Sequence, residues 1–169
     1  MAVPSSGAVS IQDLVDEFGG STPHSISEYY RGGSLVPNVS ANNSVPTSGE
    51  VSLTDFYGAV DATFIAASGG TETTSGDYKI HTFNSNGTFT VNSVGNSAGS
   101  NTVEYLVVAG GGGGAGGYRT AASFSVSAQG YSITVGGGGS GTNTRNTPGS
   151  TGSNSVFSNI TSAGGGGGG

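Results

Sequence analysis

The chain has 169 residues, of which 34 are glycine and only 8% are charged, and it has no cysteine or tryptophan. Ordinary soluble domains carry about 25% charged residues, so this composition favours a repetitive structural or adhesive protein over an enzyme. The net charge is −6 with only four lysines and arginines. The lack of a basic patch argues against nucleic acid as a partner. The lack of cysteine excludes disulfides and thiolate metal sites.

Membrane insertion and secretion by a signal peptide both lack their sequence signals. No apolar run approaches the ~20 residues that a membrane-spanning helix needs. The first four residues, Met-Ala-Val-Pro, have neither the basic region nor the apolar stretch of a secretory signal peptide. We therefore predict no membrane insertion, and no export by that route.

Residues 1–61 contain an internal repeat and form the first predicted domain. Residues 3–14 align with residues 45–56 at an offset of 42, and seven of the twelve positions are identical. In each copy Pro-Ser/Thr-Ser-Gly predicts a turn. In each copy Ser-x-x-Asp predicts a helix N-cap, because the serine oxygen accepts a free backbone N–H and the acid favours the positive end of the helix.

A third cap of the same kind stands at Ser25-Ile26-Ser27-Glu28, so the chain should contain three short amphipathic helices. We predict helices at 11–18, at 26 to about 31 and at 53–57, each ended by glycine, with 38–44 as a surface loop. Helices below about 12 residues are marginal alone, so their apolar faces must bury against each other or against another chain. The residues that we expect to serve anchoring or assembly are Ile11, Leu14, Phe18, Tyr29, Tyr30, Leu53, Phe56 and Tyr57.

Residues 62–104 change to a period of two and form the second predicted domain, a β-hairpin region. The candidate strands are 63–67, 71–74, 78–83 and 88–91. Asn86-Gly87 between alternating runs is a strong hairpin signal, so the last two should pair.

Residues 105–169 form the third predicted domain, in which strand-like runs enter glycine tracts three times. The strand at 103–109 enters tract 110–114, the strand at 131–135 enters 136–139, and the run 156–163 enters 164–169. A further strand at 123–127 should form a hairpin with 131–135, and the polar residues 140–154 read as a loop.

The glycine tracts permit two interpretations. A flexible linker is the simpler one, because ordering a residue costs roughly 1–2 kcal/mol and a hydrogen bond returns about 0.5–1.5 kcal/mol. Alternatively, several tracts pack side by side as extended threefold chains, which the missing Cβ atoms allow. Recurrence at strand ends favours packing. In either case a single tract cannot order itself, so the last one should fray unless a partner chain holds it.

The residues that could carry chemistry do not form a recognisable site. His24 and His81 lie in different modules without acids or cysteines at metal-ligand spacing, and His81 reads as a sheet-surface or interface residue. No nucleophile elbow and no phosphate loop is present. We predict no catalytic, cofactor-binding or metal-binding residue, no cofactor, and a protein that is not an enzyme.

Residues from about 77 to 169 resemble the glycine-rich domain of tailed-bacteriophage tail fibre and adhesin proteins. Segments 80–91, 103–114, 131–139 and 155–169 carry the resemblance through their order of strands and glycines. It implies glycine helices of the polyglycine II type that display variable loops. Residues 46–58 resemble N-terminal modules of marine and cyanobacterial phage structural proteins. Because such relatives continue beyond the last glycine tract, we expect this chain to be truncated at its C-terminus.

Together these features predict a mostly β, fibrous protein with a small N-terminal helical module. The resemblance implies a virion protein of the phage tail, a homotrimeric tail fibre or adhesin. Its N-terminus would bind other tail or baseplate proteins and its glycine-rich domain a host-surface receptor, such as a polysaccharide. Head decoration, a neck fibre and a bacterial surface adhesin remain alternatives. An ice-binding protein fits less well, because its glycine tracts would be regular Gly-x-x repeats.

Overall fold

The computed structural model describes residues 2–144 and 146–169, and it divides the chain into two units. The N-terminal unit runs to Phe64 and includes Gly95–Gly99; the glycine-rich unit comprises Ile65–Val94 and Ser100–Gly169. The predicted regions 62–104 and 105–169 thus fold largely as one unit. The described residues are mostly β, with antiparallel sheets and one short α-helix, as the sequence predicts.

Three capping boxes start the helices of the N-terminal unit. They begin α1 (Ile11–Phe18) and the 3-10 helices η1 (Ile26–Tyr29) and η3 (Leu53–Phe56). In each, a serine accepts a backbone N–H and the acid three residues later accepts the serine's own N–H. The predicted α1 is confirmed, whereas the other two are single 3-10 turns. Both of these end because Tyr30 and Tyr57 leave helical geometry.

The core of this unit gathers one residue from each capped helix. Leu14, Tyr29 and Phe56 each follow their box directly and are fully buried, and Phe18 packs beside them. The ring of Tyr29 contacts Phe56 edge-on with centroids 6.3 Å apart. The remaining buried members are the small apolar residues Val3, Val36, Val45 and Ala59. The repeat therefore places corresponding valines and corresponding helix residues in one core.

Residues 38–44 are not the predicted surface loop. They include the 3-10 helix η2 (Ser40–Asn42), and the side chain of Asn42 is fully buried. Its amide donates to the carbonyls of Pro37 (3.0 Å) and Val60 (2.9 Å) and accepts from the N–H of Val60 (2.9 Å). A polar segment is buried here because one amide bonds three backbone groups, of which the N–H and the carbonyl of Val60 would otherwise lack partners.

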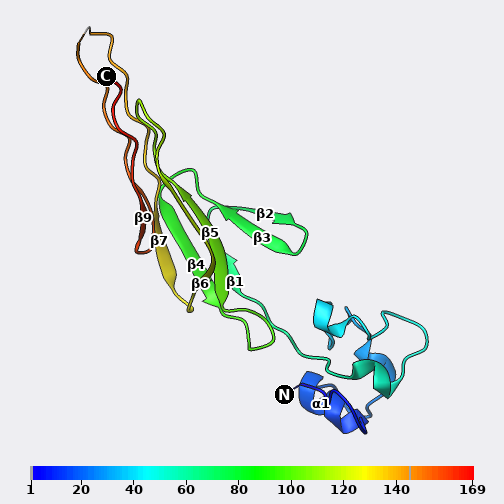
Figure 1. Ribbon diagram of the computed structural model, residues 1–169. Coiled ribbons are helices and arrows are strands. Elements are labelled where there is room, and N and C mark those ends of the chain that lie inside the picture. The colour runs from blue at the N-terminus through cyan, green and yellow to red at the C-terminus, as the bar shows by residue number, and fades with distance from the viewer. Residues whose placement is uncertain (1, 145) are drawn as a thin grey trace. The chain divides into compact units, whose positions relative to one another are not determined.

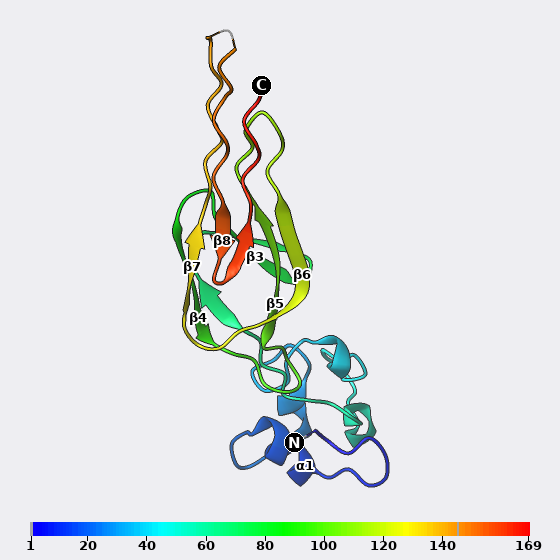
Figure 2. The ribbon, with the colours of Figure 1, turned by 60° about the vertical axis from the view of Figure 1, so that its left-hand side comes forward.

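The glycine-rich unit contains all nine strands of the described residues (Figures 1 and 2). These are β1 (Ala66–Ser68), β2 (Thr71–Ser75), β3 (Tyr78–Thr82), β4 (Gly87–Ser93), β5 (Thr102–Val108), β6 (Tyr118–Ser125), β7 (Gly130–Thr134), β8 (Ser155–Phe157) and β9 (Ile160–Ser162). A five-stranded antiparallel sheet has the order β1-β4-β7-β8-β9, and β2-β3 and β5-β6 are two-stranded. The β5-β6 pair packs on β8 and β9.

The core of this unit lies between these layers and is largely aromatic. Phe157 lies near its centre, within 5.0 Å of the ring centroid of Phe124 and 6.3 Å of Phe89. Tyr131 joins the same group, 6.0 Å from Phe157. The buried aliphatic residues of the core are Val91, Val107 and Val126. Alternation along β4, β5 and β7 turns these side chains inward, as a half-buried strand requires.

Both predicted hairpins are wrong. Strand β3 pairs with β2, not with β4, and β6 pairs with β5, not with β7. The reason is the same in each case, because both edges of the expected partner are occupied. Strand β4 lies between β1 and β7, and β7 lies between β4 and β8. The Asn-Gly turn therefore connects two separate sheets.

Three other strand predictions shift. The first strand begins at Ala66 instead of residue 63, because the backbone of Thr63 is bonded to Asn96 within the N-terminal unit. The predicted single run 156–163 is two strands, β8 and β9, joined by a turn at Ser158-Asn159. The predicted strand 123–127 corresponds to β6, which begins five residues earlier, at Tyr118, and ends at Ser125. The other predicted strands are confirmed within about two residues.

Candidate interaction surface on the glycine array

Five extended segments lie side by side beyond the strands of the glycine-rich unit, and we call them the glycine array. They are residues 110–113, 114–117, 136–141, 149–154 and 164–169. Figures 1 and 2 both show them rising together from the ends of β5 to β9 as one narrow arm. None of their glycines has a positive φ.

Backbone hydrogen bonds connect the segments directly. Gly110 donates to the carbonyl of Ser153 (3.0 Å) and accepts from Gly165 (2.9 Å). Gly139 donates to Gly111 over 2.7 Å, so segment 110–113 is bonded to three other segments. Threefold extended chains have no internal hydrogen bonds, so such lateral bonds are what can hold them together. The packed interpretation of the tracts is therefore correct, and the linker interpretation is not.

Close approach explains why these positions are glycine. A Cβ atom added to Gly152 would lie 2.0 Å from the carbonyl oxygen of Gly110, and one added to Gly164 would lie 2.0 Å from that of Gly152. Most of the crowded positions recur every third residue, as expected for three residues per turn. They are Gly110, Gly113 and Gly116; Gly136 and Gly139; Gly149 and Gly152; Gly164 and Gly167. Gly112 and Gly165 are crowded as well, because a Cβ atom there would lie 2.4 Å from the carbonyl oxygen of Gly166 and 2.3 Å from that of Gly114. Gly114, Gly137 and Gly166 instead face open space.

The last glycine tract, residues 164–169, is held in place by the same chain and needs no partner chain. Gly152 donates to Gly165, Gly114 donates to Gly166 and Gly149 donates to Gly168, at 2.8 to 3.1 Å. The expectation of fraying is wrong because residues 149–154 supply partners from the same chain. These residues belonged to the predicted loop 140–154, so only its first part is a loop.

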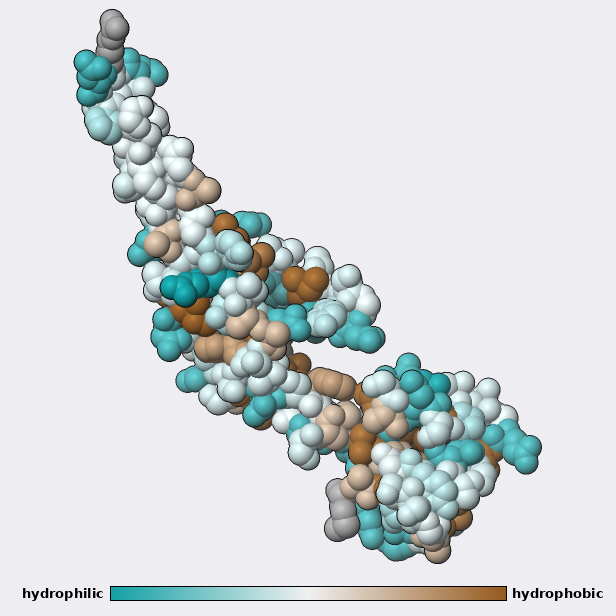
Figure 3. All heavy atoms as spheres, in the orientation of Figure 1, coloured by the Kyte–Doolittle hydropathy of each residue, from teal (hydrophilic) through white to brown (hydrophobic). Residues whose placement is uncertain are grey.

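The tip of the array is polar and uncharged among the described residues. A hollow of about 250 Å³ lies there between the loop and the chain end. Its lining residues are Gly112, Gly113, Gly139, Ser140, Gly141, Thr142, Thr147, Gly149, Gly168 and Gly169. Figure 3 shows the arm as nearly white, with hydrophilic residues gathered near its end. Arg145, the cation of this loop, lies outside the described residues.

The loop at the tip is shaped by its own side chains. The hydroxyl of Thr142 donates to the carbonyls of Thr144 and Thr147, each at 3.2 Å, and the N–H of Ser140 donates to Ser150 Oγ at 2.7 Å. Hydroxyl–backbone bonds of this kind hold polar loops in turn conformations. The tip can therefore present backbone carbonyls, N–H groups and threonine hydroxyls to a ligand.

The predicted anchoring residues split into two groups. Leu14, Phe18, Tyr29 and Phe56 bury against each other in the N-terminal core. Ile11 is exposed, and the other members are half-buried: Tyr30, Leu53 and Tyr57. The first group stabilises the unit itself, so a role in anchoring stays a prediction mainly for the second.

The two histidines lie in different units, as predicted, but His81 is not exposed on a sheet surface. His81 is not on the sheet surface: only 9% of its side chain is exposed, and its ring packs edge-on against Phe89 at 5.1 Å. Its Nδ1 donates to the carbonyl of Gly69 over 2.8 Å. His24 lies in the N-terminal unit. Within the described ranges, no three histidine, aspartate or glutamate side chains form a potential metal site.

Comparison with known proteins bears on the unit that carries the array. A family model described as a glycine-rich domain matches residues 71–169, which is more than half of the chain. The chain belongs to this glycine-rich domain family. The glycine-rich domain begins at β2 and includes the whole array. No curated protein and no solved structure matches the chain. No helix among the described residues is both long and apolar enough to cross a membrane.

Two features of the glycine-rich domain escaped the sequence analysis. Residues 149–154 contain only two glycines, and they join the array because Gly149 and Gly152 stand three apart. That spacing is the signal that could have found them. The second feature is the hydroxyl of Ser162, which is buried and has no hydrogen-bond partner among the described residues. The sequence does not distinguish this serine from the many others in the chain.

Proposed function

We propose that this protein is a structural virion protein of a tailed phage, a tail fibre or adhesin whose glycine-rich domain binds the host surface. The observation that carries the proposal is the array itself. Five hydrogen-bonded segments form a support that carries a polar loop at its tip. Such construction suits display of a loop, because the support leaves the loop free to vary in sequence.

The receptor that suits this tip is a polysaccharide. The described tip residues carry hydroxyls and backbone groups and no charged side chain. Hydroxyl-rich ligands match such a mixture of donors and acceptors, whereas an anionic ligand would call for arginine or lysine clusters. In this proposal the N-terminal unit binds other proteins of the tail or baseplate, and the protein is located in the virion.

Adsorption to host cells tests the role of the tip. Replacing residues 142–148 by a short Gly-Ser turn keeps segments 136–141 and 149–154 and removes only the loop. We expect phage carrying this variant to assemble normally and to adsorb at least about tenfold more slowly, as the loss of several hydrogen bonds predicts. The matched control is Asp77→Ser, which alters an exposed turn between β2 and β3 of the same domain. Unchanged adsorption of assembled virions would contradict the proposal for the tip.

Labelling of the virion tests its location. An antibody against the N-terminal unit should mark the tail or its baseplate in electron micrographs. Label on the head or the neck would instead favour a decoration protein or neck fibre. Absence of label from purified virions, with the protein on the bacterial surface, would favour a bacterial adhesin.

The homotrimer is supported by exposed apolar residues on the glycine-rich domain. Leu106 is 67% exposed and Val108 is 56% exposed, and both lie on the outer face of β5. Tyr118, 70% exposed, is the cross-strand partner of Val108 and shares that face. A soluble monomer rarely clusters such residues in a two-stranded sheet, so we assign this face to contact between copies of the chain.

Sedimentation equilibrium tests this assignment. We expect a species about three times the chain mass of 16.3 kDa. Replacing Leu106 and Val108 together by serine should shift it to monomer while the circular dichroism spectrum stays unchanged. Val94→Ser, which removes an exposed valine elsewhere, is the control and should leave the trimer intact. A folded monomer of the unaltered protein would refute the trimer.

A further inference from the structure

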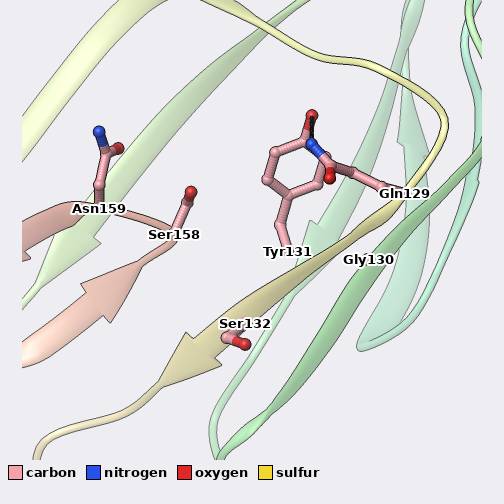
Figure 4. Close-up of a pocket in the computed structure, with 6 residues that line it drawn as sticks. All are labelled: Gln129, Gly130, Tyr131, Ser132, Ser158 and Asn159. Carbon is pink, nitrogen blue, oxygen red and sulfur yellow. Dashed lines mark hydrogen bonds between the residues drawn. The ribbon is translucent and has the colours of Figure 1, made fainter.

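A second hollow lies at the other end of the glycine-rich domain from the tip, where β7 begins and the β8–β9 turn closes. Its volume is about 360 Å³ and its lining residues are Gln129, Gly130, Tyr131, Ser132, Ser158 and Asn159. Figure 4 shows Ser158 and Asn159 on one side and Tyr131 with the amide of Gln129 on the other. The volume falls at the small end of the range of ligand sites, about 300–1,000 Å³.

The polar groups of this hollow differ in whether they are already engaged. The phenol oxygen of Tyr131 accepts from the N–H of Ser127 (2.8 Å) and from Nε2 of Gln129 (3.1 Å), so the protein itself occupies it. In the described part of the chain, no hydrogen bond is formed by the hydroxyls of Ser132 and Ser158 or by the amide of Asn159. Three side chains that can both donate and accept thus line the hollow and are available.

Ser158 has a backbone conformation with positive φ, which is unfavourable for serine. It is the first central residue of the two-residue turn between β8 and β9, and its φ is +56°. That position of a hairpin turn with positive φ favours glycine, which this chain uses freely elsewhere. A non-glycine residue held at positive φ is a recognised mark of a functional position. Here the residue adds a hydroxyl to the hollow.

We infer that this hollow is a binding site for a neutral sugar unit. The lining has no carboxylate, ammonium or guanidinium group, so nothing in it would compensate a charged ligand. Amide and hydroxyl groups match the paired donors and acceptors of a hexose. The site is separate from the tip, and the inference does not depend on a role in virions.

NMR titration of the isotope-labelled full chain tests the inference. The probes are D-glucose, D-galactose and N-acetyl-D-glucosamine, with D-glucuronate as the charged counterpart. Concentrations up to about 100 mM are needed, because a ligand of this size at ordinary ligand efficiency binds in the millimolar range. We expect at least one neutral sugar to shift the side-chain amide signals of Asn159 and Gln129, and glucuronate to shift them less.

Two variants locate the binding. Ser158→Gly removes the hydroxyl while giving the turn its preferred residue, so it should fold at least as well, and Asn159→Ala removes the amide. Each should weaken binding about 2- to 10-fold, as loss of one hydrogen bond predicts. Asn84→Ala, which alters an exposed amide between β3 and β4 outside the lining of the hollow, should leave the affinity unchanged. No shift with any neutral sugar, equal binding of glucuronate, or affinities unaffected by both variants would overturn the inference.

Discussion

The phenol of Tyr57 donates a hydrogen bond of 2.6 Å to the carbonyl of Gly7, fifty residues earlier in the chain. Gly49, the counterpart of Gly7 in the internal repeat, accepts in the same way from Tyr30. The residues that follow continue the correspondence, since Gly58 donates to Pro4 and Arg31 donates to Pro46. Each Pro-Ser/Thr-Ser-Gly turn is thus held by the end of a capped helix. The repeated sequence therefore forms the same hydrogen bonds in both copies.

Removing either phenol hydroxyl should weaken the N-terminal unit. We expect Tyr57→Phe and Tyr30→Phe each to lower its free energy of unfolding by about 0.5–1.5 kcal/mol, the net value of one hydrogen bond. Urea unfolding followed by circular dichroism measures the change. Tyr78→Phe is the control, because Tyr78 is largely exposed in β3 and should show none. Unequal effects of the two variants would show that the repeated contacts differ in strength.

Loss of the buried amide of Asn42 should be more damaging. Asn42→Ala leaves the N–H and the carbonyl of Val60 without a partner and removes one of the two donors to the carbonyl of Pro37. We expect the free energy of unfolding to fall by about 2–4 kcal/mol, because each buried unsatisfied group costs about 1–3 kcal/mol. Asn43→Ala removes only an exposed contact with Arg31 and should cost less than about 1 kcal/mol. Similar losses in both variants would mean that Asn42 is not the residue that holds this segment.

Alanine substitutions within one tract should separate crowded from open positions of the array. Gly164→Ala places a Cβ 2.0 Å from the carbonyl oxygen of Gly152, whereas Gly166→Ala meets nothing within 4 Å. We expect the first to destabilise by at least about 2 kcal/mol and the second to stay within about 0.5 kcal/mol. Hydrogen exchange of the Gly152 amide, which is bonded to Gly165, reports on both. Equal protection in both variants would contradict the packing of this array.

The first capping box should respond to acid. The hydrogen bond from the Ser10 hydroxyl, and then that from its N–H, lowers the pKa of Asp13 from 3.8. A carboxyl whose pKa is lower in the folded state stabilises it above the unfolded value, and this contribution disappears as pH falls through the folded value. The stability difference between the native protein and Asp13→Asn should therefore be present at pH 7 and shrink as the pH falls below the unfolded value of 3.8.

Acid-dependent unfolding of the two proteins measures that difference. Glu50→Gln, which alters an exposed acid outside the boxes, is the control and should reproduce the native curve. A difference between native and Asp13→Asn that does not change with pH would show that the charge of Asp13 does not support the helix.

Local features of the chain followed from its sequence. The three capping boxes begin where Ser10, Ser25 and Ser52 predict, because each box uses residues at most three apart. Most strands were placed by alternation, and the glycine tracts by composition. Of the candidate surface, the sequence predicted a polar loop beyond the second tract, but it did not show that Gly149 and Gly152 belong to the support.

Pairing was decided by tertiary structure alone. The Asn86-Gly87 turn predicts a hairpin from neighbouring residues alone. It contains no information that β1 and β7 occupy both edges of β4. Burial of Asn42 likewise depends on Val60, eighteen residues away. Sequence by itself determined where helices cap, where strands alternate and where glycine is concentrated, because those depend on neighbouring residues. Only the tertiary structure decided which backbones meet, because a hydrogen bond between segments requires both to be brought within about 3 Å.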